Sequence, residues 1–174
     1  MQDIHVVVLV HGFHGLASDM TPLKSVLMKA YPKTFFIESS VNECRTNDKI
    51  DEMGFRLAKE VITFLSQVST EEVPFLSFIG HSMGGLVIRA ALPHLECISD
   101  RMRSYVSLST PHLGMLKGFT MVDTGIRFLK KFKKSQSLKQ LTYADFGFKE
   151  GTYLYRLSHT EGCLLYTSPS PRDS

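Results

Sequence analysis

The chain has 174 residues, of which 43% are hydrophobic and 21% are charged, and its formal net charge is +3. This length suits a single domain with a hydrophobic core, and the small net charge does not favour nucleic acid as a partner. No apolar run reaches the ~18 residues of a membrane span, and Met1-Gln2-Asp3 lacks the basic start of a secretory signal, so the expected compartment is the cytoplasm.

The three cysteines, Cys44, Cys97 and Cys163, are spread unevenly along the chain. Their spacing does not match that of a metal site, so we expect free thiols. The sequence predicts neither a metal nor a cofactor.

The first predicted strand is His5–Val10, a continuous β-branched run of the kind that is buried on both faces of a parallel sheet. It leads directly into His11-Gly12-Phe13-His14-Gly15. An apolar strand followed by His-Gly is typical of a loop whose backbone N–H stabilises an oxyanion, and the predicted donor is Phe13. The alternatives for His11 and His14 are a zinc pair or simple loop polarity, and no further ligand cluster accompanies them.

The next segments alternate between helical and extended patterns. Residues 19–31 predict a helix capped by Ser18 or Asp19, with Pro22 in its first turn. Residues 34–37 predict a short strand, and residues 38–47 a polar loop. Residues 48–68 carry the longest helical pattern, which should cover one face of the sheet. Its predicted buried side consists of Ile50, Met53, Leu57, Val61, Ile62 and Leu65.

The most informative stretch is FLSFIGHSMGGLVIR, residues 75–89. It contains G-x-S-x-G between an apolar strand and a helix, the context in which this motif places a serine on a strained, exposed turn. Ser82 is therefore the predicted nucleophile, and the N–H of Met83 the predicted second oxyanion donor. Glycine is expected where a Cβ would collide as the strand and helix are forced together. Three residues of the stretch meet that description: Gly80, Gly84 and Gly85.

Residues 103–109 predict a further strand, followed by Thr110-Pro111-His112-Leu113-Gly114. Four strands alternating with helices predict a parallel βαβ architecture. Residues 117–157 read as helical segments with no clear strand. Within them, the basic side chains of residues 125–141 indicate either a solvated helix or contact with an anionic lipid surface. The lysines in question are Lys130, Lys131, Lys133 and Lys134.

With these motifs in order, residues 5–157 resemble the lipase-like serine esterases of the α/β-hydrolase superfamily. The longer segments that carry the resemblance are residues 40–43, 77–79, 110–114 and 134–141. The resemblance implies a partial α/β-hydrolase fold, with a mostly parallel sheet and flanking helices, and hydrolysis of carboxylic esters that are often lipid-like. In that fold an acid and then a histidine follow the serine, each after a later strand.

Neither later strand is present, so the triad acid and base stay unassigned. Asp123 is the best candidate for the acid, since some lipases take theirs one strand early, and His159 is a comparable candidate for the base. His112 is better explained as shaping the exit of its strand. The remaining residues of suitable type after Ser82 are Asp100, Asp145 and His94.

The last residues explain the gap. Residues 163–173, CLLYTSPSPRD, resemble the translation of a transposase adapter used in making sequencing libraries. The alternative is a natural Ser/Pro-rich disordered end. We therefore expect residues 1–162 to be the N-terminal portion of a serine esterase domain and residues 163–174 to be an artefactual, disordered tail. We also expect an unpaired, partly apolar sheet edge near residues 103–109, and a chain that is inactive as it stands.

The predicted function of the intact domain is serine-dependent hydrolysis of a small-molecule or lipid ester. Two alternatives belong to other classes. The fold can serve as a non-catalytic interaction module, which loss of the acid or base in the intact gene would indicate. The acyl group can also pass to an alcohol or amine, or come from a thioester, which product analysis with competing nucleophiles would reveal.

Overall fold

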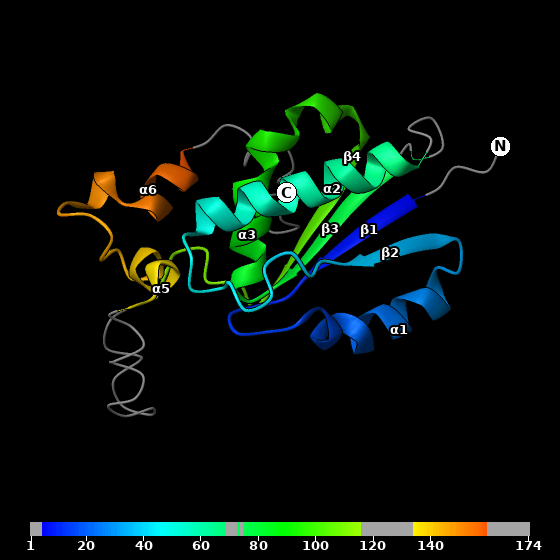
Figure 1. Cartoon of the computed structure of the whole chain (residues 1–174), viewed down its shortest axis with the longest axis horizontal. Helices are drawn as coiled ribbons and strands as arrows, with labels where there is room; N and C mark the ends of the chain where they lie inside the picture. Colours follow the sequence, from blue (N-terminus) through cyan, green and yellow to red (C-terminus); the bar gives the residue numbers. More distant parts are fainter. Residues whose placement is uncertain (1–4, 69–72, 74, 116–133, 160–174) are drawn as a thin grey trace, which may run out of the picture.

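The computed structural model describes residues 5–68, 73, 75–115 and 134–159. Its centre is a four-stranded sheet in which every neighbouring pair is parallel, in the order β2-β1-β3-β4 (Figure 1). The strands are β1 His5–Val10, β2 Thr34–Glu38, β3 Phe75–His81 and β4 Met102–Leu108. All four predicted strands and the parallel architecture are thus confirmed.

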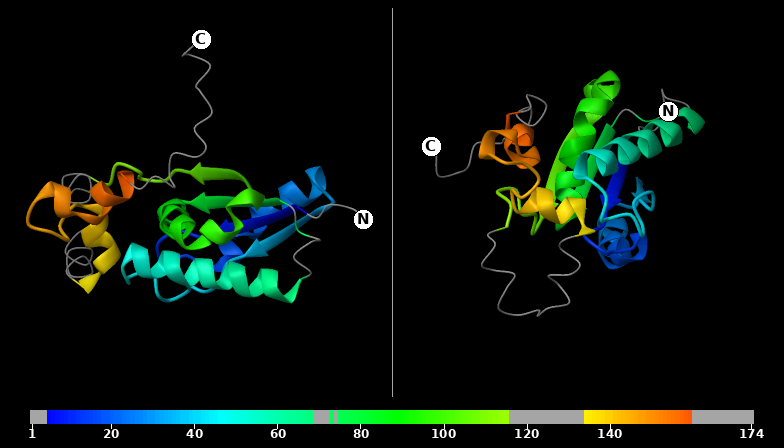
Figure 2. Two further views of the ribbon diagram at one scale, coloured as in Figure 1. Left: turned by 90° about the horizontal axis from the view of Figure 1, so that it is seen from above. Right: turned by 60° about the vertical axis from the view of Figure 1, so that its left-hand side comes forward.

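The α-helices of the described residues lie in two places. Three accompany the sheet: α1 Thr21–Ala30, α2 Ile50–Gln67 and α3 Met83–Ala91. Two short ones, α5 Gln136–Leu141 and α6 Tyr153–Ser158, lie beyond one end of the sheet (Figures 1 and 2). Where the structure describes the chain, the 3₁₀ helices are Ala17–Met20, Leu92–Arg101 and Lys149–Gly151. No strand occurs in residues 134–159, as the sequence predicts for that stretch.

The two faces of the sheet are covered unequally. Helices α2 and α3 pack on the face that carries Val6, Val8 and Val10, where they form the main hydrophobic core. Helix α1 lies on the opposite face, where Leu23 and Leu27 pack against a small cluster. Its members are Val7, Leu9, Met20 and Phe36. Because both faces of β1 are packed, its apolar run is continuous and not alternating.

Two local predictions are wrong. Helix α1 begins at Thr21 and has no side-chain cap, because Asp19 belongs to the preceding 3₁₀ turn and its Oδ2 accepts a hydrogen bond from the N–H of Leu16 at 2.9 Å. Ile62 of α2 is exposed, whereas the other five apolar residues predicted for the inner side of α2 are buried. Residue 62 follows the buried Val61 by about 100° around the helix, which turns its side chain away from the core.

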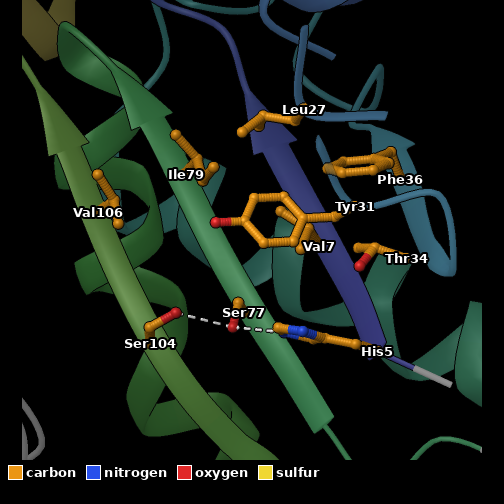
Figure 3. A pocket seen from close by; sticks show the side chains of 10 residues that line it. All are labelled: His5, Val7, Leu27, Tyr31, Thr34, Phe36, Ser77, Ile79, Ser104 and Val106. Atoms are coloured by element: carbon orange, nitrogen blue, oxygen red, sulfur yellow. Dashed lines mark hydrogen bonds between the residues drawn. The ribbon is translucent and has the colours of Figure 1, made fainter. Parts of the chain in front are cut away.

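The margin of the sheet at β4 is unpaired among the described residues. β4 ends the strand order, and its side chains Val106 and Leu108 are exposed. This agrees with the expectation for residues 103–109. On the same side of the sheet as α1, β3 and β4 border a cavity of about 350 Å³ that is mostly apolar (Figure 3). A hydrogen-bonded line of His5, Ser77 and Ser104 crosses its floor.

Candidate active site

Ser82 occupies a tight turn between β3 and α3. Strand β3 ends at His81 and helix α3 begins at Met83, which leaves a single residue for the reversal. The backbone of Ser82 has φ 52° and ψ −126°, a positive-φ conformation that side chains rarely adopt. Its N–H donates to the Leu108 carbonyl at 2.8 Å, and its carbonyl accepts from the N–H of Gly85 at 3.2 Å. The predicted strand–turn–helix with a strained serine is present.

The glycines of this turn lie where backbone segments approach most closely. A Cβ at Gly80 would lie 2.5 Å from the Gly85 nitrogen, so strand and helix could not approach each other as they do. A Cβ at Gly84 would collide with the carbonyls of Val10 and His11, at the end of β1. Gly84 therefore allows α3 to lie directly on β1, a contact that the motif alone does not predict.

Gly85 has a different neighbour, the side chain of Thr110 beyond β4. A Cβ at residue 85 would collide with the hydroxyl of Thr110 and lie 2.8 Å from its Cγ2. The first turn of α3 is thus in contact with three segments: β3 precedes it, the end of β1 lies against Gly84, and the loop after β4 packs on Gly85. These contacts fix the orientation of the Ser82 turn.

The loop after β1 lies against Ser82. A Cβ added to Gly12 would lie 3.0 Å from the Ser82 Cβ and 3.4 Å from its Oγ. The N–H of Gly15 donates to the Gly12 carbonyl at 3.1 Å, which closes a turn over residues 12–15. Within that turn, Phe13 packs against the main core and His14 has φ 57°. The structure therefore brings together the two segments that the sequence pairs as the sources of the oxyanion donors.

His11 and His14 play separate structural parts. His11 is buried, and its Nδ1 lies 3.0 Å from the Gly12 carbonyl, so this nitrogen carries the proton and donates. His14 is exposed, and its ring stacks edge-on against Phe13 with centroids 4.2 Å apart. Within the part of the chain that the structure describes, no group of three or more potential metal ligands occurs.

His112, in the loop after β4, connects that loop to α3. Its Nδ1 lies 3.3 Å from Arg89 Nη1, and its Nε2 lies 2.9 Å from Ser107 Oγ. Because Arg89 can only donate, Nδ1 must accept and Nε2 carries the proton of the neutral ring. Burial lowers the pKa of His112, and the Arg89 cation lowers it further. Both ring nitrogens are engaged away from Ser82, which agrees with a role in shaping the strand exit.

The other residues considered for the acid and base are bonded locally, are exposed, or lie outside the described residues. His159 is exposed and bonds locally to the carbonyl of Tyr155, and Asp145 accepts from the N–H of Tyr153 at 2.8 Å. Asp100 and His94 are exposed. In residues 5–68, 73, 75–115 and 134–159, no histidine or carboxylate is hydrogen-bonded to the Ser82 side chain. The remaining candidate, Asp123, lies outside the described residues.

The basic side chains singled out for membrane contact are mostly not described. Lys130, Lys131 and Lys133 lie outside the described residues, and Lys134 is exposed just before α5. The adapter-like tail, residues 163–174, also lies outside them. None of the helices in the described ranges combines the length and apolar character needed to cross a bilayer.

Sequence reasoning did not identify the contacts that support the loop after β1. The N–H of His14 donates to Thr46 Oγ1 at 3.0 Å, and the Thr46 carbonyl accepts from Ser137 Oγ at 2.7 Å. These three residues come from three segments separated by 32 and 91 positions. No local pattern signals such a contact, although the resemblance does single out residues 134–141.

Known proteins with similar sequences point to one family. The profile of the family described as "Putative serine esterase (DUF676)" matches residues 1–168. A relative from Saccharomyces cerevisiae, "Putative lipase YDL109C", is 29% identical over 175 aligned positions, which cover 90% of this chain and 25% of that protein. The chain thus spans about a quarter of the length of this curated relative.

Two solved structures share the fold. Mature lipase BlEst2 from Bacillus licheniformis superposes with a TM-score of 0.59 at 18% identity, over 88% of this chain and 62% of that one. Phospholipase PlaB from Legionella pneumophila superposes with a TM-score of 0.60 at 13% identity, over 95% of this chain and 36% of that one. Both neighbours agree with a partial α/β-hydrolase fold, as the sequence predicts. The chain therefore belongs to the family described as "Putative serine esterase (DUF676)", and its described residues have a partial α/β-hydrolase fold.

Proposed function

We propose that this chain supplies the nucleophile and the oxyanion hole of a serine hydrolase that cleaves carboxylic esters. Ser82 is the nucleophile, and the backbone N–H groups of Phe13 and Met83 are the oxyanion donors. One observation carries the proposal. The positive-φ turn at Ser82 lies against the turn of residues 12–15, so close that a Cβ at Gly12 would lie only 3.0 Å from the Ser82 Cβ. A strained serine and a second backbone segment at van der Waals distance are what a shared oxyanion site needs.

The proposed reaction has two halves. The Ser82 Oγ attacks the ester carbonyl carbon while a base removes its proton, and the carbonyl oxygen becomes an oxyanion held by the two N–H groups. Collapse breaks the bond to the alkoxy group, which leaves with that proton as an alcohol. Water then attacks the acyl-serine in the same way, releases the carboxylic acid and restores Ser82. The base and its acidic partner lie outside the described residues.

The position of Ser82 at the end of α3 favours this chemistry. Met83 is the first residue of α3, so its N–H has no carbonyl partner within the helix. The N-terminus of the helix also carries a partial positive charge, which stabilises negative charge forming nearby. Each oxyanion donor of this kind is typically worth about 3 to 4 kcal/mol of barrier in serine hydrolases.

A lipid-like acyl group is the proposed substrate class. The support is the family, together with the lipase named among the relatives and the phospholipase among the structural neighbours. Hydrolysis of esters that differ only in acyl chain length, by the full-length protein, tests this assignment. Turnover that rises with chain length is the expected result, and a preference for acetyl esters would overturn it.

A fluorophosphonate probe tests the nucleophile itself. In the full-length protein we expect labelling at Ser82, loss of labelling in Ser82→Ala, and retention in a control variant, Ser99→Ala, which alters an exposed serine. Equal labelling of wild type and Ser82→Ala would show that another residue reacts.

A non-catalytic role is the second candidate, favoured by one observation. Three histidines follow Ser82 in the described residues, and two of them, His94 and His159, are exposed. The third, His112, is partly buried, but both of its ring nitrogens are engaged by Arg89 and Ser107. The same probe separates the two functions, because a serine without a base reacts poorly. No labelling of the full-length wild type at any pH from about 6 to 9 would favour the interaction module.

A further inference from the structure

The turn that holds the proposed Phe13 donor is strained at its third residue. Residues 12–15 are closed by the Gly15 N–H to Gly12 carbonyl bond, and His14 sits at φ 57°, where glycine or asparagine is normally favoured. A strained backbone conformation persists only where contacts with the surrounding structure hold it in place. At the start of the turn, Gly12 is in contact with Ser82. The strained residue itself, His14, also needs a contact that stabilises its conformation.

Thr46 provides that second support. The residue is only 3% exposed, and its Oγ1 accepts a hydrogen bond from the N–H of His14 at 3.0 Å. This bond fixes the plane of the peptide that joins Phe13 to His14. Asn47 adds a weaker contact, with its Nδ2 3.4 Å from the His14 Nε2. The loop after β2 therefore holds the turn at its strained residue.

Helix α5 in turn holds Thr46 in place. Ser137, which is fully buried, donates its Oγ proton to the Thr46 carbonyl at 2.7 Å. The N–H of Gln136 donates to the Asn47 carbonyl at 2.8 Å, and Gln140 Oε1 accepts from the N–H of Ile50 at 2.6 Å. The segment 46–50 is thus bonded to α5 at residues 46, 47 and 50, which restricts the movement of the Thr46 hydroxyl.

We infer that Thr46 is a positioning residue for the oxyanion hole, with Ser137 as its support. The inference rests on the proposed function. Thr46 touches no reacting atom. It holds the Phe13–His14 peptide, and through the turn it limits how far the adjoining Gly12–Phe13 peptide, which carries the Phe13 N–H, can rotate. A turn with a positive φ at a non-glycine residue relaxes readily when its anchoring bond is lost, and a donor aimed away from the oxyanion no longer stabilises it.

The test compares three variants of the full-length protein. Thr46→Val has nearly the same shape but no acceptor, and Thr46→Ser restores the hydroxyl. Thr152→Val is the matched control, because Thr152 is equally buried and its hydroxyl donates to the Lys149 carbonyl, away from the loop after β1. Hydrogen exchange of the peptide containing residues 13–15 reports the turn, and kcat and KM for an ester report the oxyanion hole.

We expect Thr46→Val to raise exchange at residues 13–15 and to lower kcat by about tenfold or more at nearly unchanged KM, since losing one oxyanion donor outright costs ~100-fold or more. Thr46→Ser should recover most of both. Thr152→Val should change neither, even if it lowers the melting temperature as much as Thr46→Val does.

Unchanged exchange at residues 13–15 in Thr46→Val would overturn the inference, whatever the activity. Faster exchange with an unchanged kcat would overturn it as well, because the turn would then not control the donor. A full-length wild type that neither hydrolyses esters nor reacts with the probe would instead overturn the proposed function. In that case, hydrogen exchange at residues 13–15 would still show whether Thr46 holds the turn in place.

Discussion

At the scale of single residues, the site depends on backbone conformation more than on side-chain chemistry. Ser82 and His14 both have positive φ values, and each lies in a turn directly after a strand. The motif predicts the strain at Ser82, because glycines on both sides of a serine signal a crowded turn. Nothing in the sequence signals the strain at His14, because the Thr46 hydroxyl that bonds to its N–H lies 32 residues away.

The strain at Ser82 gives a stability prediction. Glycine tolerates φ 52° and ψ −126°, whereas alanine retains the Cβ that makes this conformation unfavourable. A conformation of this type costs about 1 to 3 kcal/mol, and the extra chain entropy of glycine offsets part of the relief. We expect Ser82→Gly to be more stable than Ser82→Ala by about 1 kcal/mol in urea denaturation. Equal midpoints for the two variants would contradict strain at this position.

At the scale of elements, the strands can be predicted from the sequence, whereas the hydrogen bonds that join one element to another cannot. The strand His5–Val10 is a buried, mostly apolar run, and residues 75–79 are apolar except for the buried Ser77. Burial on both faces is what makes such runs visible in a sequence. The start of α1 was misassigned because Asp19 has the residue type of a cap but bonds to the 3₁₀ turn before the helix. The type of a side chain alone does not show which nearby N–H group it accepts from.

Gln140 of α5 caps a helix ninety residues earlier in the chain. Its Oε1 accepts from the N–H of Ile50, the first residue of α2, and its Nε2 donates to Asp51 at 3.1 Å. Gln140→Ala leaves that buried N–H unsatisfied, so we expect a loss of about 1 to 3 kcal/mol in unfolding free energy. Gln136→Ala, at an exposed position of the same helix, is the control and should stay within about 0.5 kcal/mol. Equal losses in the two variants would rule out the cap.

His112, which joins the loop after β4 to α3, predicts a pH dependence of stability. Burial and Arg89 lower its pKa in the folded state, so the unfolded chain binds the proton more tightly. The stability it contributes is present above its unfolded pKa of about 6.5 and is lost as pH falls towards its folded pKa. The unfolding free energy should therefore rise from about pH 5 to about pH 7.

Variants identify the source of that slope. His112→Asn keeps an acceptor near Arg89 but cannot titrate, so we expect a flatter pH profile in urea denaturation. Part of the slope should remain, because burial and then Arg103 also lower the pKa of His5. An unchanged slope in His112→Asn would show that His112 does not titrate differently in the folded and unfolded states.

At the scale of the whole molecule, the described residues form a sheet that is packed on one face and partly open on the other. Helices α2 and α3 cover the face of the main core, while α1 leaves Ile79 and Val106 beside the cavity shown in Figure 3. Because no further apolar run follows residue 109, the sequence predicts that β4 is an edge strand, and β4 does end the sheet among the described residues. The sequence could not predict the cavity, whose shape depends on how far α1 reaches across the sheet.

The open margin predicts self-association of the 174-residue chain. An edge strand with exposed apolar side chains can pair with another copy, and a lysine on such an edge opposes pairing. Val106 is 43% exposed on β4, so Val106→Lys should raise the temperature at which light scattering begins. Val26→Lys, on α1 where Val26 is 65% exposed, is the control and should have a smaller effect. Equal protection by both lysines would attribute association to general apolar exposure.

The adjacency of β1 and β3 has one further consequence. The loop with Phe13 and the turn with Ser82 extend from neighbouring parallel strands, whose backbones are spaced about 4.8 Å apart by their ladder of hydrogen bonds. The distance between the two segments is therefore set by the strand spacing that all parallel sheets have in common. Substitutions in either loop can rotate an amide without changing that spacing. A wider spacing would require the separation of β1 and β3, which pair along six positions. The strand spacing is therefore harder for substitutions to alter than the direction of either N–H group.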